Sequence, residues 1–343
     1  MIDIAQKDNN LLEIKDLKVY IKIDEGTLQA VDGISFHMQK GKTMGLVGES
    51  GCGKSLTAKA ILGINPDNCK SSGEILFDNK GQLVKLLELE KDGQQIRDIR
   101  GGEISMIFQE PMTAFSPLHT IGNQIMESIL LHRTKDKKEA EAIAIEMLEL
   151  VGIANAKERI RQYPHEFSGG MRQRAMIAMA LCCNPDLLIA DEPTTALDVT
   201  IQAQVLDLMN GLREKFGMAI LLITHDLGVI SEMCDEVAVM YLGHIVEKTT
   251  VREIFYNPKH PYTKGLLKSI PKMGNKGIER LHTIEGSVPL PLNLPPMCRF
   301  YERCQDRIEG LCNKCEVPEV QLSPDHTVKC FLYVDKMKDM EVV

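Results

Sequence analysis

The stretch GESGCGKS, residues 48–55, constrains the fold of this chain more than any other feature. It fits the phosphate-loop pattern G-x-x-x-x-G-K-S, after an apolar run at 43–47 that predicts a strand and before a segment at 56–63 that predicts a helix. The glycines let backbone amides surround phosphate oxygens, and the helix adds its positive N-terminal end. The residues of this stretch expected to contact a nucleotide are Gly48, Ser50, Gly51, Cys52, Gly53, Lys54 and Ser55, together with Leu56 directly after it.

Two of these side chains have distinct chemical roles. Lys54 supplies a mobile positive charge to the β and γ phosphates of a nucleotide, and the Ser55 hydroxyl is a ligand for Mg²⁺. Cys52 is expected to be a small filler inside the loop and not a nucleophile. The pattern therefore predicts ATP with Mg²⁺ as the bound cofactor.

A second motif, which ends in two acidic residues, follows further along the chain in DLLIADEP at 186–193. The short apolar run is typical of a buried parallel strand. Asp191 at its end would hold Mg²⁺, directly or through water, and Glu192 could polarise an attacking water as a general base. By itself a strand that ends in two acids is weak evidence, but together with a phosphate loop it predicts nucleotide hydrolysis.

The remaining pattern alternates between strands and helices. Residues 11–23 alternate apolar and polar side chains as a strand would, residues 219–226 form another apolar run, and residues 123–151 have helical spacing. From about residue 258 prolines and then cysteines dominate, which suggests a connector and a small appendage. A mostly parallel α/β core with a helical subdomain follows from this order.

Composition narrows the class of partner. The formal net charge of the 343 residues is -8, which argues against a protein that binds the nucleic-acid backbone. No apolar stretch is long enough to span a bilayer, and the N-terminal residues lack the form of a secretory signal. We therefore expect the chain in the cytosol, where cysteines are more often thiols or metal ligands than disulfides.

Further motifs carry a resemblance to ATP-binding-cassette ATPases. Ser168, Gly169 and Gly170 in EFSGGMRQR resemble the signature loop of that family, which forms a second anion site at a helix end. Gln109 in MIFQEP matches the glutamine that senses the metal and the γ-phosphate. His225 in LLITHD matches the histidine that contacts the γ-phosphate. Tyr20 lies where the family places an aromatic side chain that stacks on adenine, although an ordinary strand tyrosine is the alternative.

The resemblance implies an α/β P-loop NTPase core, with a RecA-like lobe, an antiparallel β subdomain and a helical subdomain at about 112–172. It implies a nucleotide-binding domain at 1–257 and a cysteine-rich extension at 258–343. Glu192, His225 and Lys54 would be catalytic, and Ser55 and Gln109 would bind Mg²⁺. In this family two such domains pack head to tail, and ATP lies between the phosphate loop of one subunit and the signature loop of the other. One chain alone is therefore expected to hydrolyse ATP poorly.

A narrower resemblance concerns the ATPase subunits of bacterial dipeptide/oligopeptide importers, with nickel importers as the alternative. The stretches at 108–129 and 257–267 and the tail of prolines and cysteines are similar to that group. The group implies a heterodimer with a paralogous ATPase, two membrane-spanning permease subunits and an extracytoplasmic substrate-binding protein, at the cytoplasmic face of the cell membrane. No nucleic-acid partner is expected. The rival is a soluble cassette ATPase that acts on nucleic acid or ribosomes, but the stretch between Ser55 and Ser168 is too short for a long coiled-coil insertion.

The tail CRFYERCQDRIEGLCNKC begins at Cys298 and also contains Cys304, Cys312 and Cys315, with Cys330 beyond it. In the importer group a similar tail resembles a segment that binds a [4Fe–4S] cluster. The resemblance implies that Cys298, Cys304, Cys312 and Cys330 would be the ligands of this cluster. Cys315 remains a rival to Cys312, because the third cysteine is displaced by one residue. A zinc site and free thiols are the alternatives. A tail of this size cannot bury much apolar surface, so a metal centre would have a structural role.

Overall fold

The computed structural model describes residues 9–109, 114–195, 198–270 and 284–334. The chain divides into two compact units, each assembled from segments that are distant in the sequence. The first unit consists of residues 1–12, 37–43 and 76–223, and the second consists of residues 13–36, 44–75 and 224–343. A boundary between domains at residue 257 stays a prediction.

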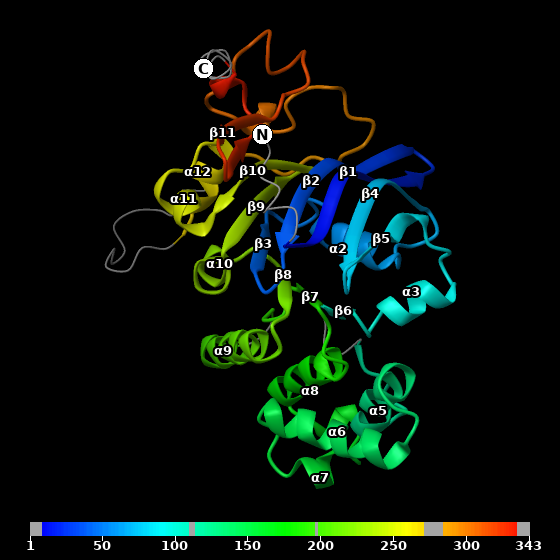
Figure 1. Cartoon of the computed structure of the whole chain (residues 1–343). Coiled ribbons are helices and arrows are strands. Elements are labelled where there is room, and N and C mark those ends of the chain that lie inside the picture. Colours follow the sequence, from blue (N-terminus) through cyan, green and yellow to red (C-terminus); the bar gives the residue numbers. More distant parts are fainter. Residues whose placement is uncertain (1–8, 110–113, 196–197, 271–283, 335–343) are drawn as a thin grey trace. The chain divides into compact units, whose positions relative to one another are not determined.

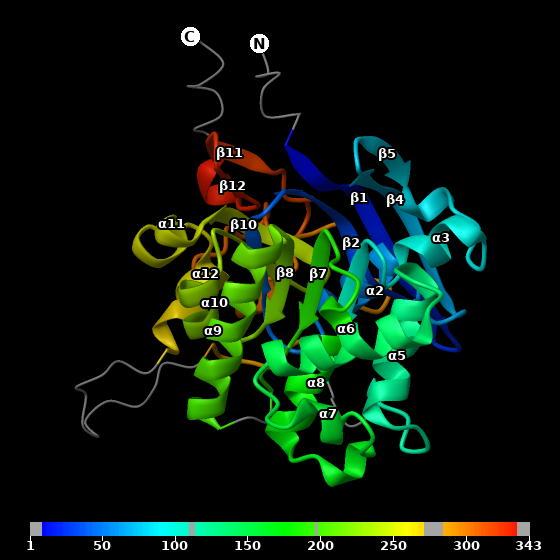
Figure 2. The ribbon, with the colours of Figure 1, turned by 60° about the horizontal axis from the view of Figure 1, so that its bottom comes forward.

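The first unit contains three adjacent parallel strands. They are β6 (Ile104–Ile107), β7 (Leu187–Asp191) and β8 (Ala219–Thr224, in this unit up to residue 223). Figure 2 shows β7 and β8 side by side. Every residue of β7 and β8 is buried, as expected for parallel strands that are covered on both faces. The strands predicted from the apolar runs at 186–193 and 219–226 are therefore confirmed.

Helices make up most of the rest of the first unit, and four of them pack together, visible in green in Figure 1. These four are α5 (Ile121–His132), α6 (Lys137–Leu150), α7 (Ala156–Arg159) and α8 (Gly169–Leu181). The helical prediction for 123–151 is confirmed as two helices, each with a side-chain N-cap, Thr120 for α5 and Asp136 for α6. The remaining elements are β5 (Gln82–Lys85), which pairs with the end of β4, η1 (Leu86–Glu88), α3 (Gln94–Ile99), η2 (Pro164–Glu166) and α9 (Val199–Phe216).

The second unit contains a mixed sheet in the order β11-β12-β10-β9-β3. Strand β3 runs parallel to β9, and the other neighbours are antiparallel. The strands are β3 (Thr43–Val47, in this unit from residue 44), β9 (Glu236–Tyr241), β10 (His244–Thr250), β11 (Val320–Ser323) and β12 (His326–Val328). The cysteine-rich tail thus contributes the last two strands to this sheet, a pairing that the sequence pattern did not predict.

Three long strands have most of their residues in the second unit and lie in the order β2-β1-β4. They are β1 (Asn10–Ile23), β2 (Gly26–Gln39) and β4 (Cys69–Asn79), so the strand predicted at 11–23 is confirmed. The helices of the unit are α2 (Lys54–Leu62), α10 (Leu227–Met233), α11 (Val251–Tyr256), α12 (Pro261–Lys268), η3 (Tyr301–Arg303) and η4 (Phe331–Tyr333). Among the helices in the described ranges, none is long and apolar enough to cross a membrane.

A fully buried carboxylate joins three elements of the second unit. Glu247 on β10 accepts hydrogen bonds from the backbone N–H of Lys259 (2.7 Å) and of His260 (2.8 Å), and it lies 2.8 Å from Nε2 of His326 on β12. Burial alone would raise the pKa of Glu247, but the hydrogen bonds, led by that of His326, lower it overall. The carboxylate therefore fixes the start of α12 and the tail strand against β10.

Candidate nucleotide-binding site

The phosphate loop lies in the second unit, between β3 and α2. A Cβ on Gly48 would lie 2.1 Å from the carbonyl oxygen of Met240, and one on Gly53 would lie 2.3 Å from that of Ala30. Gly53 also has φ 106°, a conformation that side chains rarely adopt. The two glycines are thus required by close backbone approach. Cys52 is 1% exposed, as the filler role predicts.

Lys54 begins α2, two residues earlier than the predicted helix, and its side chain folds back over the loop. Its Nζ donates to the carbonyl oxygens of Gly48 (2.7 Å) and Glu49 (3.1 Å). The N-cap residue Gly53 offers no side-chain hydrogen bond to the first turn. Backbone amides at a helix end, together with a lysine, are an arrangement suited to binding phosphate, as the sequence pattern predicts for this loop.

Tyr20 and His225 also belong to the second unit. The Tyr20 hydroxyl donates to Oδ1 of Asp32 at 2.5 Å, and burial followed by this hydrogen bond raises the pKa of Tyr20 to about 12. The bond fixes the orientation of a half-buried ring that sequence reasoning assigned to adenine. His225 is exposed directly after β8, where Asp226 caps α10.

Gln109 and Glu192 meet in the first unit. Oε2 of Glu192 accepts hydrogen bonds from Nε2 of Gln109 (3.0 Å) and from Oγ1 of Thr195 (2.9 Å). Glu192 has φ 47°, an uncommon conformation for a residue with a side chain and one that recurs at functional sites. Asp191, the last residue of β7, is 3% exposed. The structure thus joins Gln109, the predicted sensor, to Glu192, the predicted base. Thr195, the other partner of Glu192, was not predicted from the sequence.

The signature residues begin α8 in the first unit. Ser168 is the exposed N-cap, and its Oγ accepts from the backbone N–H of Met171 at 3.3 Å. The following residue, Gly169, is exposed, and a Cβ there would meet no atom within 4 Å. Further along α8, Nε2 of Gln173 donates to the carbonyl oxygen of Pro193, directly after Glu192. The signature helix is therefore bonded to the loop that carries the predicted base of its own chain. The stretch ALD at 196–198, which resembles the loop that communicates across the dimer in ATP-binding-cassette ATPases, lies mostly outside the described residues.

The predicted cluster ligands gather in the tail of the second unit. Burial, together with the neighbouring thiols of Cys312, Cys304 and Cys330, raises the pKa of Cys298 to about 12. Burial raises the pKa of Cys330 to about 11, with Cys304 and Cys312 again nearby. Sγ of Cys312 accepts the backbone N–H of Ile308 at 3.3 Å, and the backbone N–H of Cys298 donates to the carbonyl oxygen of Cys312 at 2.9 Å.

Cys315, by contrast, is exposed. In the ranges that the structure describes, no three histidine, cysteine, aspartate or glutamate side chains are placed so that they could hold a metal ion. The four thiols are near enough to affect one another's pKa, but the described side chains do not converge on a formed metal site.

Two arginines near the nucleotide elements were missed by sequence reasoning, which considered only the cysteines of this segment. Arg299 bonds Asp32, the partner of Tyr20, and Arg303 bonds Glu49 of the phosphate loop. The only sequence signal is an arginine beside each of the first two cysteines, in CRFYERC.

The sequence matches the ABC transporter family over residues 31–195. It is also 50% identical over 334 residues to the oligopeptide transport ATP-binding protein AppD of Bacillus subtilis, covering 96% of this chain and 98% of the relative. The chain therefore belongs to the ATP-binding proteins of ABC transporters, as its motifs implied.

Within this class, residues 246–312 match the C-terminal region of oligopeptide/dipeptide transporters. The chain is 49% identical to the dipeptide transport ATP-binding protein DppD of Bacillus subtilis, covering 94% of each chain, and 45% identical to the oligopeptide transport ATP-binding protein OppD of Salmonella typhimurium, covering 97% and 96%. It thus belongs to the branch that these ATP-binding proteins represent.

A solved structure of the ATP-binding cassette MJ0796, a dimer bound to ADP and Pi, matches with a TM-score of 0.62 at 26% identity. The match covers 71% of this chain and 99% of that one. The fold expected from the sequence, a P-loop NTPase core of the ABC type, is confirmed.

Proposed function

We propose that the chain is the ATP-hydrolysing, energy-coupling subunit of an ABC importer for dipeptides or oligopeptides. The observation that carries this proposal is the match along nearly the whole chain to peptide-transport ATP-binding proteins, including the transporter-specific C-terminal region. The buried phosphate-loop lysine and the Gln109–Glu192 pair support hydrolysis as its chemistry.

In this proposal, the loop amides and Lys54 bind the phosphates. Ser55 and Gln109 would be ligands for Mg²⁺, and Asp191 would hold the ion directly or through water. Glu192 accepts a proton from the attacking water, and His225 contacts the γ-phosphate. The exposed N-terminus of α8, with Ser168 to Gly170, would complete the ATP site of a partner subunit. ATP would then hold the closed dimer together, and its hydrolysis would release the dimer.

The partner ATPase is proposed to be a paralogue, so that the working unit is a heterodimer. Both would dock at the cytoplasmic face of the membrane on two permease subunits, which an extracytoplasmic binding protein supplies with substrate. Co-expression with an affinity tag on this chain alone tests the composition. A complex with one copy of each paralogue is expected, and two copies of this chain on the permeases would contradict the heterodimer.

The transport function is tested in proteoliposomes that contain the complete complex and its binding protein. Stimulation of ATP turnover by binding protein loaded with peptide, and uptake of labelled peptide that needs ATP, are expected. Stimulation by nickel but not by any peptide would overturn the peptide assignment. ATPase activity that never responds to the permeases would overturn the importer function itself.

We also propose that Cys298, Cys304, Cys312 and Cys330 bind a [4Fe–4S] cluster, with zinc as the alternative. Their mutual proximity and the amide hydrogen bond to Cys312 support this, since cluster sulfurs commonly accept such bonds. The cluster would have a structural role here, because bonds between thiolates and the metal would close the loops of the tail. Burial raises the pKa of three of these thiols, so binding has to displace protons.

A matched pair of variants tests the ligand set. Full-length protein is purified without oxygen, and iron, acid-labile sulfide and visible absorption are measured. Cys312→Ser is expected to lose the iron, whereas Cys315→Ser, three residues away and exposed, is expected to keep it. A colourless protein with stoichiometric zinc would refute the cluster. Loss of iron in Cys315→Ser but not in Cys312→Ser would instead make Cys315 the third ligand.

A further inference from the structure

The segment 298–304 carries two arginines whose side chains are only 6% and 5% exposed. Nη2 of Arg299 lies 2.5 Å from Oδ2 of Asp32 and also donates to Gln29 at 3.0 Å. Arg303 forms a bidentate pair with Glu49, at 2.7 Å and 3.1 Å. Bidentate arginine–carboxylate pairs are geometrically specific and stronger than neutral hydrogen bonds.

Each carboxylate leads directly to a proposed nucleotide contact. The other oxygen of Asp32 accepts the hydroxyl of Tyr20 at 2.5 Å, at the adenine end of the site. Glu49 is the second residue of the phosphate loop, and its carbonyl oxygen accepts Nζ of Lys54 at 3.1 Å. One short segment of the tail is thus bonded to both ends of the proposed nucleotide site, through contacts that all lie in the second unit.

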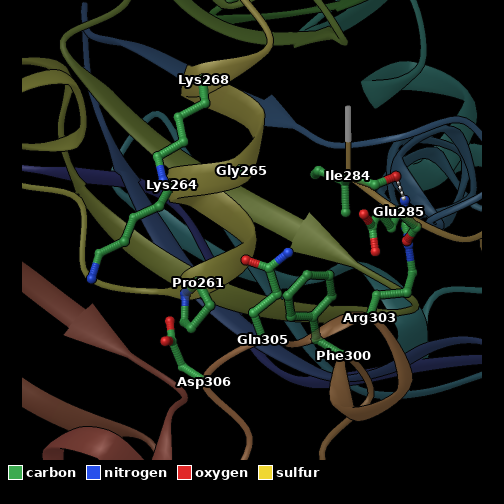
Figure 3. A pocket seen from close by; sticks show the side chains of 10 residues that line it. All are labelled: Pro261, Lys264, Gly265, Lys268, Ile284, Glu285, Phe300, Arg303, Gln305 and Asp306. Atoms are coloured by element: carbon green, nitrogen blue, oxygen red, sulfur yellow. Dashed lines mark hydrogen bonds between the residues drawn. The ribbon is translucent and has the colours of Figure 1, made fainter. Parts of the chain in front are cut away.

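The segment is held rigidly by its own packing. Phe300, between the arginines, is 4% exposed and packs on Tyr241 and Tyr262, with ring centroids 5.1 Å and 5.4 Å apart. The Tyr262 hydroxyl in turn accepts the backbone N–H of Glu49 at 3.0 Å. Figure 3 shows Phe300 and Arg303 in a pocket that α12 and the tail line together. In the same view Arg303 lies beside Glu285, whose carbonyl oxygen accepts its Nε at 3.0 Å.

We propose that Arg299 and Arg303 are positioning residues that make ATP affinity depend on the C-terminal tail, an inference that rests on the proposed phosphate-loop function. Arg303 neutralises the carboxylate of Glu49, a residue of the phosphate loop, and it fixes the backbone whose carbonyl oxygen accepts Nζ of Lys54. Arg299 acts at the other end, because it holds Asp32 and thereby the ring of Tyr20.

The two roles predict different ligand dependences. Loss of Arg303 leaves the charge of Glu49 uncompensated, so the repulsion grows with the number of phosphates on the ligand. Loss of Arg299 affects only the adenine end, so it changes binding of a nucleotide but not of inorganic tripolyphosphate. A general loss of folding would weaken every ligand alike.

The experiment measures dissociation constants of the full-length chain for ATP, ADP, AMP and tripolyphosphate. Arg303→Met is expected to weaken the binding of ATP by roughly 30-fold, the lower end of the range for truncating one partner of a buried charge pair, with smaller losses for ADP and AMP. Adding Glu49→Gln to Arg303→Met is expected to restore most of the ATP affinity, because the unpaired charge is gone. Arg303→Lys is expected to retain an intermediate affinity and covers the case in which the methionine variant does not fold.

Arg299→Met is expected to weaken the binding of ATP, ADP and AMP by the same factor and to leave the binding of tripolyphosphate unchanged. In a chain that already carries Tyr20→Ala, Arg299→Met is expected to have no additional effect. The matched control is Arg307→Met in the same tail, whose side chain is 43% exposed and pairs only loosely with Glu309, at 4.0 Å. Equal ATP affinity of Arg303→Met and this control would overturn the inference, as would a double variant no better than Arg303→Met. Unchanged tripolyphosphate binding in Lys54→Ala would instead refute the phosphate loop itself.

Discussion

Replacement of Glu192 by glutamine tests the proposed chemistry most selectively within the chain. Two hydrogen bonds to this side chain fall on Oε2, from Gln109 at 3.0 Å and from Thr195 at 2.9 Å. A glutamine can place its amide oxygen at the same point and accept both bonds. The variant therefore keeps the shape of the side chain and these two hydrogen bonds, and it loses the negative charge and the ability to accept a proton.

The expected magnitude follows from that difference. General-base catalysis contributes about 10²- to 10⁴-fold, so turnover should fall by that factor, or by about 3–5 kcal/mol in the activation barrier. ATP affinity should stay within about threefold, because the two bonds to Oε2 keep an acceptor. With release of the dimer blocked, the ATP-bound closed assembly should accumulate.

The assay is steady-state phosphate release from the reconstituted complex, with ATP binding and the assembly state measured on the same preparation. Thr195→Val is the matched control, since it removes one hydrogen bond to the carboxylate, of about 1.5 kcal/mol, and should lower turnover by only about tenfold. A Glu192→Gln variant that turns over within tenfold of the wild type would refute the general-base role.

Three further changes have defined outcomes. Lys54→Ala should abolish ATP binding measured by calorimetry, because it removes the only side-chain charge proposed for the β and γ phosphates, and tight binding would count against that role. Phe300→Ala should lower the free energy of unfolding by about 3–5 kcal/mol in denaturant titrations, and a cost below about 1 kcal/mol would contradict its place in the aromatic core. Burial lowers the pKa of His260 to about 4, below the value near 6.5 expected when unfolded, so the unfolded chain takes up the proton first as the pH falls. The free energy of unfolding should therefore show no loss from His260 above about pH 6.5. It should decline toward pH 4 by up to about 1.4 kcal/mol per pH unit, and His260→Gln should flatten that slope.

Local sequence patterns were sufficient to predict the elements that carry the motifs proposed to be catalytic. Strand β3 covers residues 43–47 as predicted, because five consecutive buried residues leave a clear apolar run. Helix α2 begins at Lys54 and not at residue 56, since Gly53 serves as its N-cap and the phosphate loop merges directly into its first turn. A sequence period gives the type of an element more reliably than its first residue.

Contacts between distant segments could not be predicted in the same way. Arg303 and Glu49 are 254 residues apart, and His326 and Glu247 are 79 residues apart. No local periodicity links such charges, because their pairing depends on how the tail packs against β9, β10 and α12. The sequence showed the cysteines of the tail by their spacing, but not the arginines that connect it to the phosphate loop.

The central claim is that each ATP is shared between two subunits. The most direct measurement is a structure of the complete transporter that carries Glu192→Gln and is saturated with Mg²⁺ and ATP. The account predicts that Oγ of Ser168 lies within hydrogen-bond distance of the γ-phosphate of the ATP held by the other ATPase subunit. It would be contradicted by ATP enclosed within one chain, with Ser168 distant from every γ-phosphate in the closed assembly.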